Sequence, residues 1–237
     1  RMSGIKKIFK YIKYIPTVFS DIIKFFIVYI PGPTGRKIRY LYWKNKFKRC
    51  GKNVYIDEGV IIQNPEWISI GDNVWIDKYC ILMAGPVNMD NRLYKKRENK
   101  NFKYQEGELI IGSGIHIGIN SIIQAHGGVY IGNNVTMSAG VKIYSLSNMV
   151  TNPHNLSMPM YANFLVKEQK QVGYIISPIV IEDGVWIGLN SIVLGGSIGK
   201  NSFVAPYSLV LYDIEENSYA SGNPAKKIKE RFKMEEK

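Results

Sequence analysis

Three histidines, His116, His126 and His154, are the side chains of this 237-residue chain best suited to move a proton near neutral pH, because free imidazole titrates at about pH 6.5. His126 stands in the run Gln-Ala-His-Gly-Gly at 124–128, where the glycines predict a chain corner. His116 and His126 are ten residues apart, and no Cys or His cluster has the spacing of zinc ligands, so we expect no bound metal. A histidine at a corner is suited instead to general-base chemistry.

A six-residue apolar repeat predicts the scaffold that must position these side chains. Its anchors are Ile70, Ile76, Leu82, Ile111, Ile117, Ile123, Ile131, Met137, Ile143, Ile181, Ile187, Val193, Ile198, Val204 and Val210. This spacing is neither the period of about 3.6 residues of a helix nor the two-residue period of a strand. Hexapeptide repeats are typical of a parallel β-helix, in which three hexads close one triangular rung and Gly, Asn and Asp gather at the corners.

The breaks in the repeat fall at one phase of its eighteen-residue cycle. The irregular intervals follow the residues that begin the third face of a rung, which are Ile62, Leu82, Ile123, Ile143 and Val193. Since rungs stack in register, these bulges and loops must share one edge of the prism. The two long insertions, residues 85–107 and 145–178, therefore predict a functional site along that edge.

The charge of the chain is concentrated in its first fifth. Residues 1–49 contain thirteen Lys or Arg and one acid, a net of 13 − 1 = +12, whereas the rest of the chain contains 18 of each sign. Within 1–49, Ile5, Ile8, Phe9, Ile12 and Ile15 follow helical spacing with lysines on the other face. A second, mostly apolar run at 18–30 is shorter than the roughly 20 residues that span a bilayer.

We therefore expect residues 1–49 to be a basic amphipathic helical extension that lies on an anionic membrane surface. A subunit-packing arm is an alternative, but it explains only the apolar stripe. Nucleic-acid binding explains only the charge and is accompanied by no recognised motif, so we expect no nucleic-acid partner. The two cysteines, Cys50 and Cys80, provide no disulfide framework and favour a reduced, cytoplasmic setting, with the protein peripheral at the inner face of the membrane.

Residues 111–229 resemble the hexapeptide-repeat acyltransferases, in particular the acetyltransferases that modify sugars, antibiotics and surface polysaccharides. The motifs that carry this resemblance are the Val-Trp-Ile-Gly hexad at 185–188, the regular run at 198–208, and the tail Ala-Ser-Gly-Asn-Pro-Ala-Lys at 220–226. The resemblance implies an all-β, left-handed parallel β-helix over residues 50–222. It also implies a homotrimer with acetyl-CoA as acyl donor between adjacent prisms, and we expect a short C-terminal helix over 223–237.

The resemblance further implies a histidine that takes a proton from the acceptor, and His126 is the base that we favour. In many such enzymes the catalytic histidine lies where the chain leaves the rung for the long loop, but the stretch 145–149 contains none. His154, folded back from that loop, is the alternative base, and a degenerate family member is the third possibility. Asn148 is expected to orient the acceptor or to be an ordinary turn residue, and His116 to point outward from a flat face.

The cofactor side of the site is also taken from the resemblance. Trp186 and Gly188 match positions that line the pantetheine channel, and Ala205 and Ser208 stand in a run that departs from the Gly-Ala-Gly-Ser of relatives. The lysines expected to neutralise the CoA phosphates are Lys226, Lys227 and Lys229. Backbone N–H groups of Gly195 or Gly196 are expected to stabilise the oxyanion.

These expectations together predict an acetyl-CoA-dependent O-acetyltransferase. Its acceptor would be a sugar hydroxyl of a bacterial capsule, lipopolysaccharide or exopolysaccharide, or of a precursor, with direct transfer in a ternary complex. The alternatives are N-acetylation of an amino sugar or nucleotide-linked amino sugar, and a catalytically degenerate trimeric scaffold. A γ-type carbonic anhydrase is disfavoured because it requires two histidines five residues apart.

Overall fold

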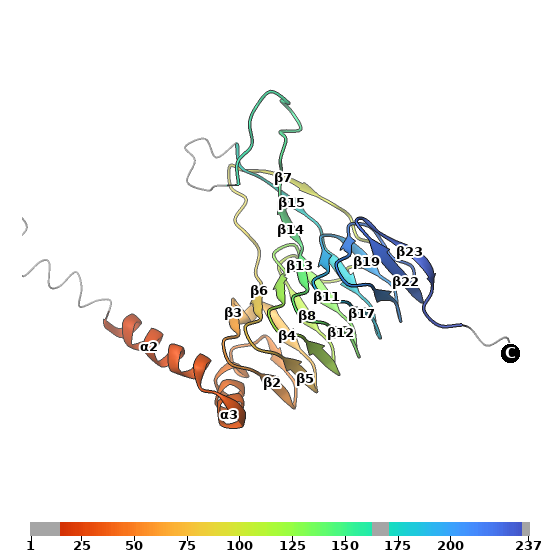
Figure 1. The fold of residues 1–237 in the computed structure, drawn as a ribbon. Helices are drawn as coiled ribbons and strands as arrows, with labels where there is room; N and C mark the ends of the chain where they lie inside the picture. Colours follow the sequence, from red (N-terminus) through yellow and green to blue (C-terminus); the bar gives the residue numbers. More distant parts are fainter. Residues whose placement is uncertain (1–14, 163–170, 234–237) are drawn as a thin grey trace, which may run out of the picture.

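The computed structural model describes residues 15–162 and 171–233. Its short strands stack into a left-handed parallel β-helix, a three-sided prism that runs from the orange rungs to the blue rungs of Figure 1. Two helices stand at the N-terminal end of the prism, and a small sheet rises from one of its edges. The predicted fold class is thereby confirmed.

Each face of the prism is one parallel sheet, apart from a final antiparallel strand. The first face contains β1 (Arg49–Cys50), β4 (Ile68–Ile70), β8 (Leu109–Ile111), β11 (Val129–Ile131), β16 (Ile179–Ile181) and β19 (Gly196–Ile198). The second contains β2 (Val54–Ile56), β5 (Val74–Ile76), β9 (Ile115–Ile117), β12 (Thr136–Met137), β17 (Trp186–Ile187), β20 (Phe203–Val204), β22 (Ser218–Gly222) and β23 (Ala225–Glu230). The third contains β3 (Ile61–Gln63), β6 (Ile81–Met83), β10 (Ile122–Gln124), β13 (Lys142–Tyr144), β18 (Ile192–Val193) and β21 (Leu209–Val210).

The rungs keep one register although their lengths differ. Val129 lies opposite Leu109 in the rung before it and opposite Ile179 in the rung after it, so the same phase is kept across steps of 20 and 50 residues. Every anchor of the apolar repeat from Ile70 to Val210 is buried in the prism. Burial of such a side chain stabilises the fold by about 1.5–3 kcal/mol, so the repeat is the main source of the register.

Two of the three edges are regular columns of residues with positive φ. The column between the first and second faces consists of Asn53, Asn73, Gly114, Asn134, Gly184, Asn201 and Asn217. The column between the second and third faces consists of Gly59, Tyr79, Asn120, Gly140, Asn190 and Tyr207. Asparagine and glycine tolerate this left-handed conformation best, which explains their recurrence at the predicted corners. These two edges turn the chain the same way in every rung and leave little room for variation.

The third edge, between the third and first faces, carries the irregular segments, as the phase of the repeat predicted. The 3-10 helix η1 (Pro65–Trp67) occupies the first of these intervals. The two long insertions contain β7 (Leu93–Lys96), β14 (Leu146–Asn148) and β15 (Gly173–Ile176), which form a three-stranded sheet. β15 pairs in parallel with β7 and antiparallel with β14, so the insertions support each other above the edge (Figure 1).

The N-terminal extension contains α2 (Ile15–Tyr29) and α3 (Gly32–Trp43), which confirms the expected helical character of its described part. The predicted apolar stripe from Ile5 to Ile12 lies outside the described residues. Trp43, at the end of α3, is buried and closes the N-terminal end of the core. Gly35 lets α3 approach the end of α2, because a Cβ there would lie 1.9 Å from the carbonyl oxygen of Ile30. Neither of these helices, nor any other in the described part of the chain, is long and apolar enough to cross a membrane.

The predicted C-terminal helix was wrong for the described residues of 223–237. Residues Ala225–Glu230 form β23, which folds back antiparallel on β22. The physical reason is the open edge of the second face, because β22 would otherwise leave its backbone N–H and C=O groups without partners on one side. Ala225 is buried against this end of the core, so β23 also caps the last rung.

Candidate active site

His126 follows β10 at the third edge and is held in one orientation by the insertion. Its ring is partly buried, and its Nδ1 lies 2.7 Å from the carbonyl oxygen of Gly85, the first residue of the 85–107 insertion. A carbonyl can only accept a hydrogen bond, so Nδ1 must carry the proton. In the neutral ring the lone pair is then on the remaining nitrogen, Nε2, which is the one able to accept a proton from a substrate.

The two ends of the 85–107 insertion fix the position of the Gly85 carbonyl. The backbone N–H of Gly85 donates to the carbonyl oxygen of Gly107, at 2.8 Å, so the two ends of the segment are tied together beside His126. Both glycines have positive φ, of 85° and 87°. The insertion is thus anchored where it leaves the prism, and the same anchor orients the imidazole.

Ser145 holds the chain that follows His126. It is fully buried, its hydroxyl donates to the carbonyl oxygen of Gln124 at 2.9 Å, and it accepts from the backbone N–H of Gly127 at 2.9 Å. Gly127 is needed here because a Cβ would lie 2.3 Å from the carbonyl oxygen of Ser145. β10 pairs with β13 as far as Gln124 and Tyr144, and the corner after His126 then lies against Ser145, where the long loop begins.

A segment of the first insertion, residues 97–104, crosses the third edge as a strap. Phe102 packs on Gly128, where an added Cβ would lie 2.3 Å from the Phe102 ring. Tyr104 stacks on Tyr130 with ring centroids 5.1 Å apart. Asn99 donates to the carbonyl oxygens of Pro178 and Gly196, at 3.0 and 3.2 Å. The strap therefore spans several rungs and covers the edge next to His126.

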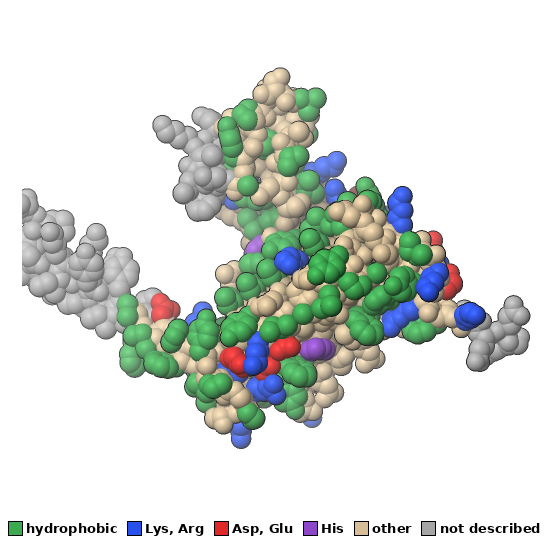
Figure 2. Space-filling view, in the orientation of Figure 1, with side chains coloured by type: hydrophobic (Ala, Val, Ile, Leu, Met, Phe, Trp, Pro, Cys, Tyr) green, Lys and Arg blue, Asp and Glu red, His purple; other side chains and the backbone are tan. Residues whose placement is uncertain are grey.

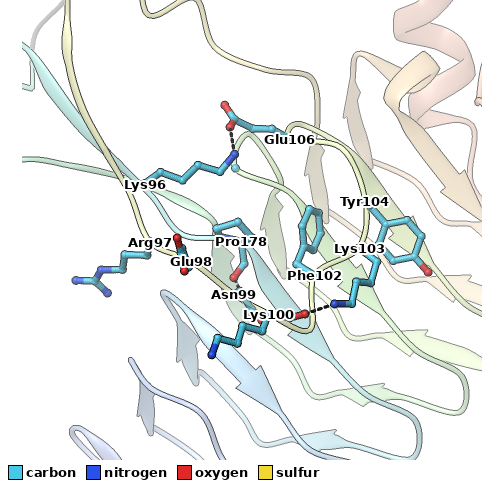
Figure 3. A pocket seen from close by; sticks show the side chains of 11 residues that line it. Lys96, Arg97, Glu98, Asn99, Lys100, Phe102, Lys103, Tyr104, Glu106 and Pro178 are labelled. Carbon is cyan, nitrogen blue, oxygen red and sulfur yellow. Dashed lines mark hydrogen bonds and ion pairs between the residues drawn. The ribbon is translucent and has the colours of Figure 1, made fainter.

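Beneath and beside the strap lies an open groove of about 380 Å³, which we call the edge groove. It is lined by Lys96, Arg97, Glu98, Asn99, Lys100, Phe102, Lys103, Tyr104, Glu106, Gly127 and Pro178. Four basic and two acidic side chains give it a net charge of 4 − 2 = +2. Figure 3 shows the Lys96–Glu106 ion pair, 3.0 Å long, at one end, and Lys100 and Lys103 at the other. His126 itself does not line the groove, but the next residue, Gly127, does, so the groove reaches the corner that follows His126.

The other two proposed catalytic residues stand farther out on the second insertion. Asn148 is exposed at the end of β14, opposite Tyr174. His154 is exposed, and its backbone N–H is bound by the side chain of Asn152 in a local turn. Neither side chain has a hydrogen bond to His126 in the described part of the chain. The roles of Asn148 and His154 stay predictions.

The predicted oxyanion donors are not brought to His126 within one chain. Gly196 pairs with Ile179, which pairs with Val129, so it lies two rungs beyond the corner that follows His126. Two rungs of parallel strands separate groups by about 10 Å, too far for both to touch one carbonyl group. Gly195 precedes Gly196 at the same edge, near Arg97 of the strap. Gly196 instead anchors the far end of the strap, because its carbonyl oxygen accepts from Asn99.

Three of the predicted cofactor contacts lie on the outer surface of the second face. Trp186 is 45% exposed and stacks edge to face on Phe203, which in turn contacts Tyr219. Lys229 places its ammonium 5.2 Å from the Tyr219 ring. Lys226 is exposed beside them on β23. Aromatic rings next to free ammonium groups can bind a base and phosphates, which is the chemistry expected of a CoA site.

The remaining predicted cofactor residues are engaged within the protein. Ser208 is buried, and its hydroxyl accepts from the N–H of Gly222. Ala205 is also buried, and its carbonyl accepts from Ser191. Lys227 is paired with Glu215 and Glu230, at 3.1 and 2.6 Å. Gly188 lies against Pro206 and has no room for a side chain. These four residues make contacts within the protein, so they stabilise the prism and are less suited to binding a ligand.

His126 and Trp186 lie on opposite sides of one prism. His126 is at the edge between the third and first faces, whereas Trp186 and Lys229 are on the second face, which is opposite that edge. His116 is also on the second face, beside Trp75, and its Nε2 lies 3.7 Å from Asp77. The predicted base and the predicted cofactor surface can therefore meet only if two copies of the chain lie side by side.

Three residues of the site are not predicted by the sequence motifs. Gly85 orients His126, Ser145 holds the following corner, and Asn99 fastens the strap. A signal existed for Ser145, because it ends a rung at the start of the long loop. Nothing in the repeat marks Gly85 or Asn99, since both act through segments that are outside the hexapeptide pattern.

Comparison with known proteins agrees with this architecture. A family model described as the hexapeptide repeat of succinyl-transferase matches residues 108–145 and 178–205. The dTDP-4-amino-4,6-dideoxy-D-glucose acyltransferase of Escherichia coli is 31% identical over 188 residues, which are 79% of this chain and 84% of that protein. The Saccharomyces cerevisiae protein YJL218W, provisionally named an acetyltransferase, is 36% identical over 120 residues, 50% of this chain and 57% of its own length.

A solved structure has a similar fold over most of its length. It is a variant of AntD, an N-acyltransferase from Bacillus cereus, in complex with dTDP and coenzyme A. The TM-score is 0.62 with 25% identity, and the match covers 81% of this chain and 89% of that chain. With the rungs, the single irregular edge and the E. coli relative taken together, the chain belongs to the family of hexapeptide-repeat acyltransferases.

Proposed function

We propose that the protein transfers an acetyl or related acyl group from its coenzyme A thioester to the amino group of a nucleotide-linked amino sugar. The observation that carries this proposal is the similarity to the E. coli dTDP-amino-sugar acyltransferase over 79% of the chain. It favours the N-acylation that the sequence analysis held as the alternative to O-acetylation.

The edge groove suits an acceptor of this class. A nucleotide-linked sugar carries a diphosphate, and the groove, which reaches the residue after His126, has a net charge of +2. Lys96 is already paired with Glu106, so Arg97, Lys100 and Lys103 are the cations that remain for an anionic ligand. Phe102 and Tyr104 add aromatic surface on which a nucleobase or sugar ring can stack.

The chemistry needs one base and no covalent enzyme intermediate. Nε2 of His126 accepts a proton from the acceptor nitrogen as that nitrogen attacks the thioester carbonyl. The bond between the carbonyl carbon and sulfur then breaks, and the sulfur of coenzyme A leaves as a thiolate that takes up a proton. The Gly85 carbonyl oxygen holds the proton of the neutral ring on Nδ1 and so directs the lone pair to Nε2.

The proposed site requires a second copy of the chain. Trp186 and Lys229 are on the face opposite His126, so an acyl-CoA bound to them reaches the histidine of a neighbouring prism. The exposed aromatic residues of the second face, Tyr55, Trp75 and Trp186, support contact with a neighbour. We propose the homotrimer that this family resemblance implies, which mass photometry would test.

Two acceptors that differ in one atom test the proposed reaction. Release of coenzyme A from acetyl-CoA is followed with dTDP-4-amino-4,6-dideoxy-D-glucose and with dTDP-6-deoxy-D-glucose, which carries a hydroxyl in place of the amine. The proposal predicts turnover and an N-acetyl product, identified by mass spectrometry, with the amine alone. Turnover with the hydroxyl alone would overturn it.

O-acetylation of a polysaccharide hydroxyl is the second candidate, and the free Nε2 of His126 favours it. A neutral hydroxyl is a weaker nucleophile than an amine and depends more on such a base. Acetyl transfer to an oligosaccharide of a surface polysaccharide, with none to either dTDP sugar, would support this candidate. No turnover with any acceptor would favour the degenerate scaffold.

A further inference from the structure

One face of α2 is a continuous apolar surface that the rest of the described chain leaves uncovered. Its large side chains are between 43% and 64% exposed, and they are Val18, Phe19, Ile22, Ile23, Phe25, Phe26 and Tyr29. At about 100° per residue these positions occupy roughly 160° of the helix surface. Figure 2 shows apolar side chains gathered over this helix, which projects from the N-terminal end of the prism.

The opposite side of α2 faces the protein or is polar. Val28 is buried, and the ammonium of Lys24 lies 6.0 Å from the ring of Trp43 at the end of α3. Ser20 and Asp21 are on the same side of the helix. The apolar face is therefore turned away from the prism, and no part of the described chain packs against it.

α2 is fixed to the prism by buried hydrogen bonds. The side chain of Arg39 is fully buried and donates to the carbonyl oxygens of Ile30 and Ile56, at 2.6 and 2.7 Å. The carbonyl of Val28 accepts from the backbone N–H of Gly59, at 3.0 Å, in the first rung. These contacts satisfy carbonyl groups at the C-terminal end of α2 and hold the helix at a set angle.

The charge of the N-terminal extension indicates what kind of partner binds the apolar face of α2. Residues 1–49 contain thirteen basic residues and one acid. A second copy of the chain would bring the same positive segment against the first, and like charges so placed repel. A surface of anionic lipid is complementary to both properties, because it accepts apolar side chains between acyl chains and attracts lysine and arginine.

We propose that α2 lies in the interface of an anionic lipid bilayer with its seven exposed apolar side chains inserted. The prism is then held by its N-terminal end, and the third edge stays open to acceptors. This function is independent of acyl transfer and does not require the proposed reaction to be correct.

The test is flotation of the full chain with vesicles in a density gradient. The vesicles contain phosphatidylcholine alone or phosphatidylcholine with about one third phosphatidylglycerol, at low and at high salt. The wild-type protein is expected to float with the anionic vesicles and less at high salt. The double variant Phe19→Glu/Phe26→Glu is expected to lose at least about tenfold in partitioning, because two rings that would insert into the bilayer are replaced by charges.

A matched double variant separates insertion of α2 from a change in net charge. Val150→Glu/Leu156→Glu makes the same charge change at two residues that are 84% and 82% exposed on the second insertion. It is expected to float like the wild type. The proposal is overturned if the wild type fails to float, if both double variants lose flotation equally, or if the α2 variant still floats. Loss of oligomeric mass in the α2 variant with unchanged flotation would identify a second copy as the occupant.

Discussion

Replacement of Arg39 by methionine tests how the N-terminal helices are joined to the prism. Methionine keeps an unbranched apolar stem but removes the guanidinium, which donates to Ile30 and Ile56 at 2.6 and 2.7 Å. Hydrogen bonds from a charged donor contribute about 1.5–3 kcal/mol each, so the two short bonds amount to roughly 3–6 kcal/mol. Burial opposes this gain, since it lowers the pKa of Arg39 by penalising the charged form.

The net effect of Arg39→Met is therefore a loss of about 3 kcal/mol in the free energy that holds α2 on the prism. A loss of this size raises the local opening constant by roughly 150-fold, because each 1.4 kcal/mol is about one factor of ten. Native-state hydrogen exchange at the amides of α2 measures that constant directly. Lys37→Met, an exposed position on the same helix α3, removes the same charge and is the control. Equal exchange of the α2 amides in the two variants would show that the Arg39 hydrogen bonds do not hold this helix on the prism.

Three further predictions concern charge, burial and the cofactor. Asp57→Asn is expected to cost about 2 kcal/mol at neutral pH; burial raises the pKa of Asp57, but hydrogen bonds from its arginine and tryptophan partners outweigh it and hold that pKa below the usual value. The stabilisation by Asp57 is thus present above about pH 4 and is lost as the pH falls further. Urea unfolding should therefore show the free energies of unfolding of the wild type and Asp57→Asn converging at acid pH, and a difference that stays constant with pH would contradict this. Burial raises the pKa of the Cys80 thiol to about 12, so Cys80 should react with a disulfide reagent only as fast as the protein unfolds, and rapid labelling of the native protein would be inconsistent with the fold. Lys229→Ala should raise the KM for acetyl-CoA about fivefold with little change in kcat, while Lys52→Ala, an exposed control, should not; equal KM values would place the coenzyme elsewhere.

The prism could be predicted from the sequence because its signal is repeated many times. Each anchor such as Ile131 or Val193 is weak evidence alone, but their shared phase fixes the rungs and places the irregular intervals at one edge. The strand Ala225–Glu230 was mistaken for a helix because no repeat covers it, and its conformation is set by the open edge of β22. Short segments of this kind depend on tertiary pairing more than on local preference.

The site could be predicted only as far as it follows the repeat. Counting residues predicts that the corner of His126 lies beside the start of the long loop, and the hydrogen bond from Gly127 to Ser145 agrees. The hydrogen bond from His126 to Gly85 joins two residues that are 41 positions apart, and Gly85 begins an insertion outside the repeat. No local sequence pattern therefore predicts this bond. The same holds for the pairing of Tyr94 with Tyr174, which builds the sheet above the edge.

We propose that the imidazole of His126, held at the irregular edge, serves as the base for acyl transfer from coenzyme A. The most direct measurement is the steady-state rate of coenzyme A release by the wild type, His126→Ala and His154→Ala at saturating acetyl-CoA and acceptor. Loss of a general base lowers kcat by about 10²–10⁴-fold, and this is predicted for His126→Ala, with the circular dichroism spectrum unchanged and with His154→Ala close to the wild type. Wild-type turnover by His126→Ala would contradict the account.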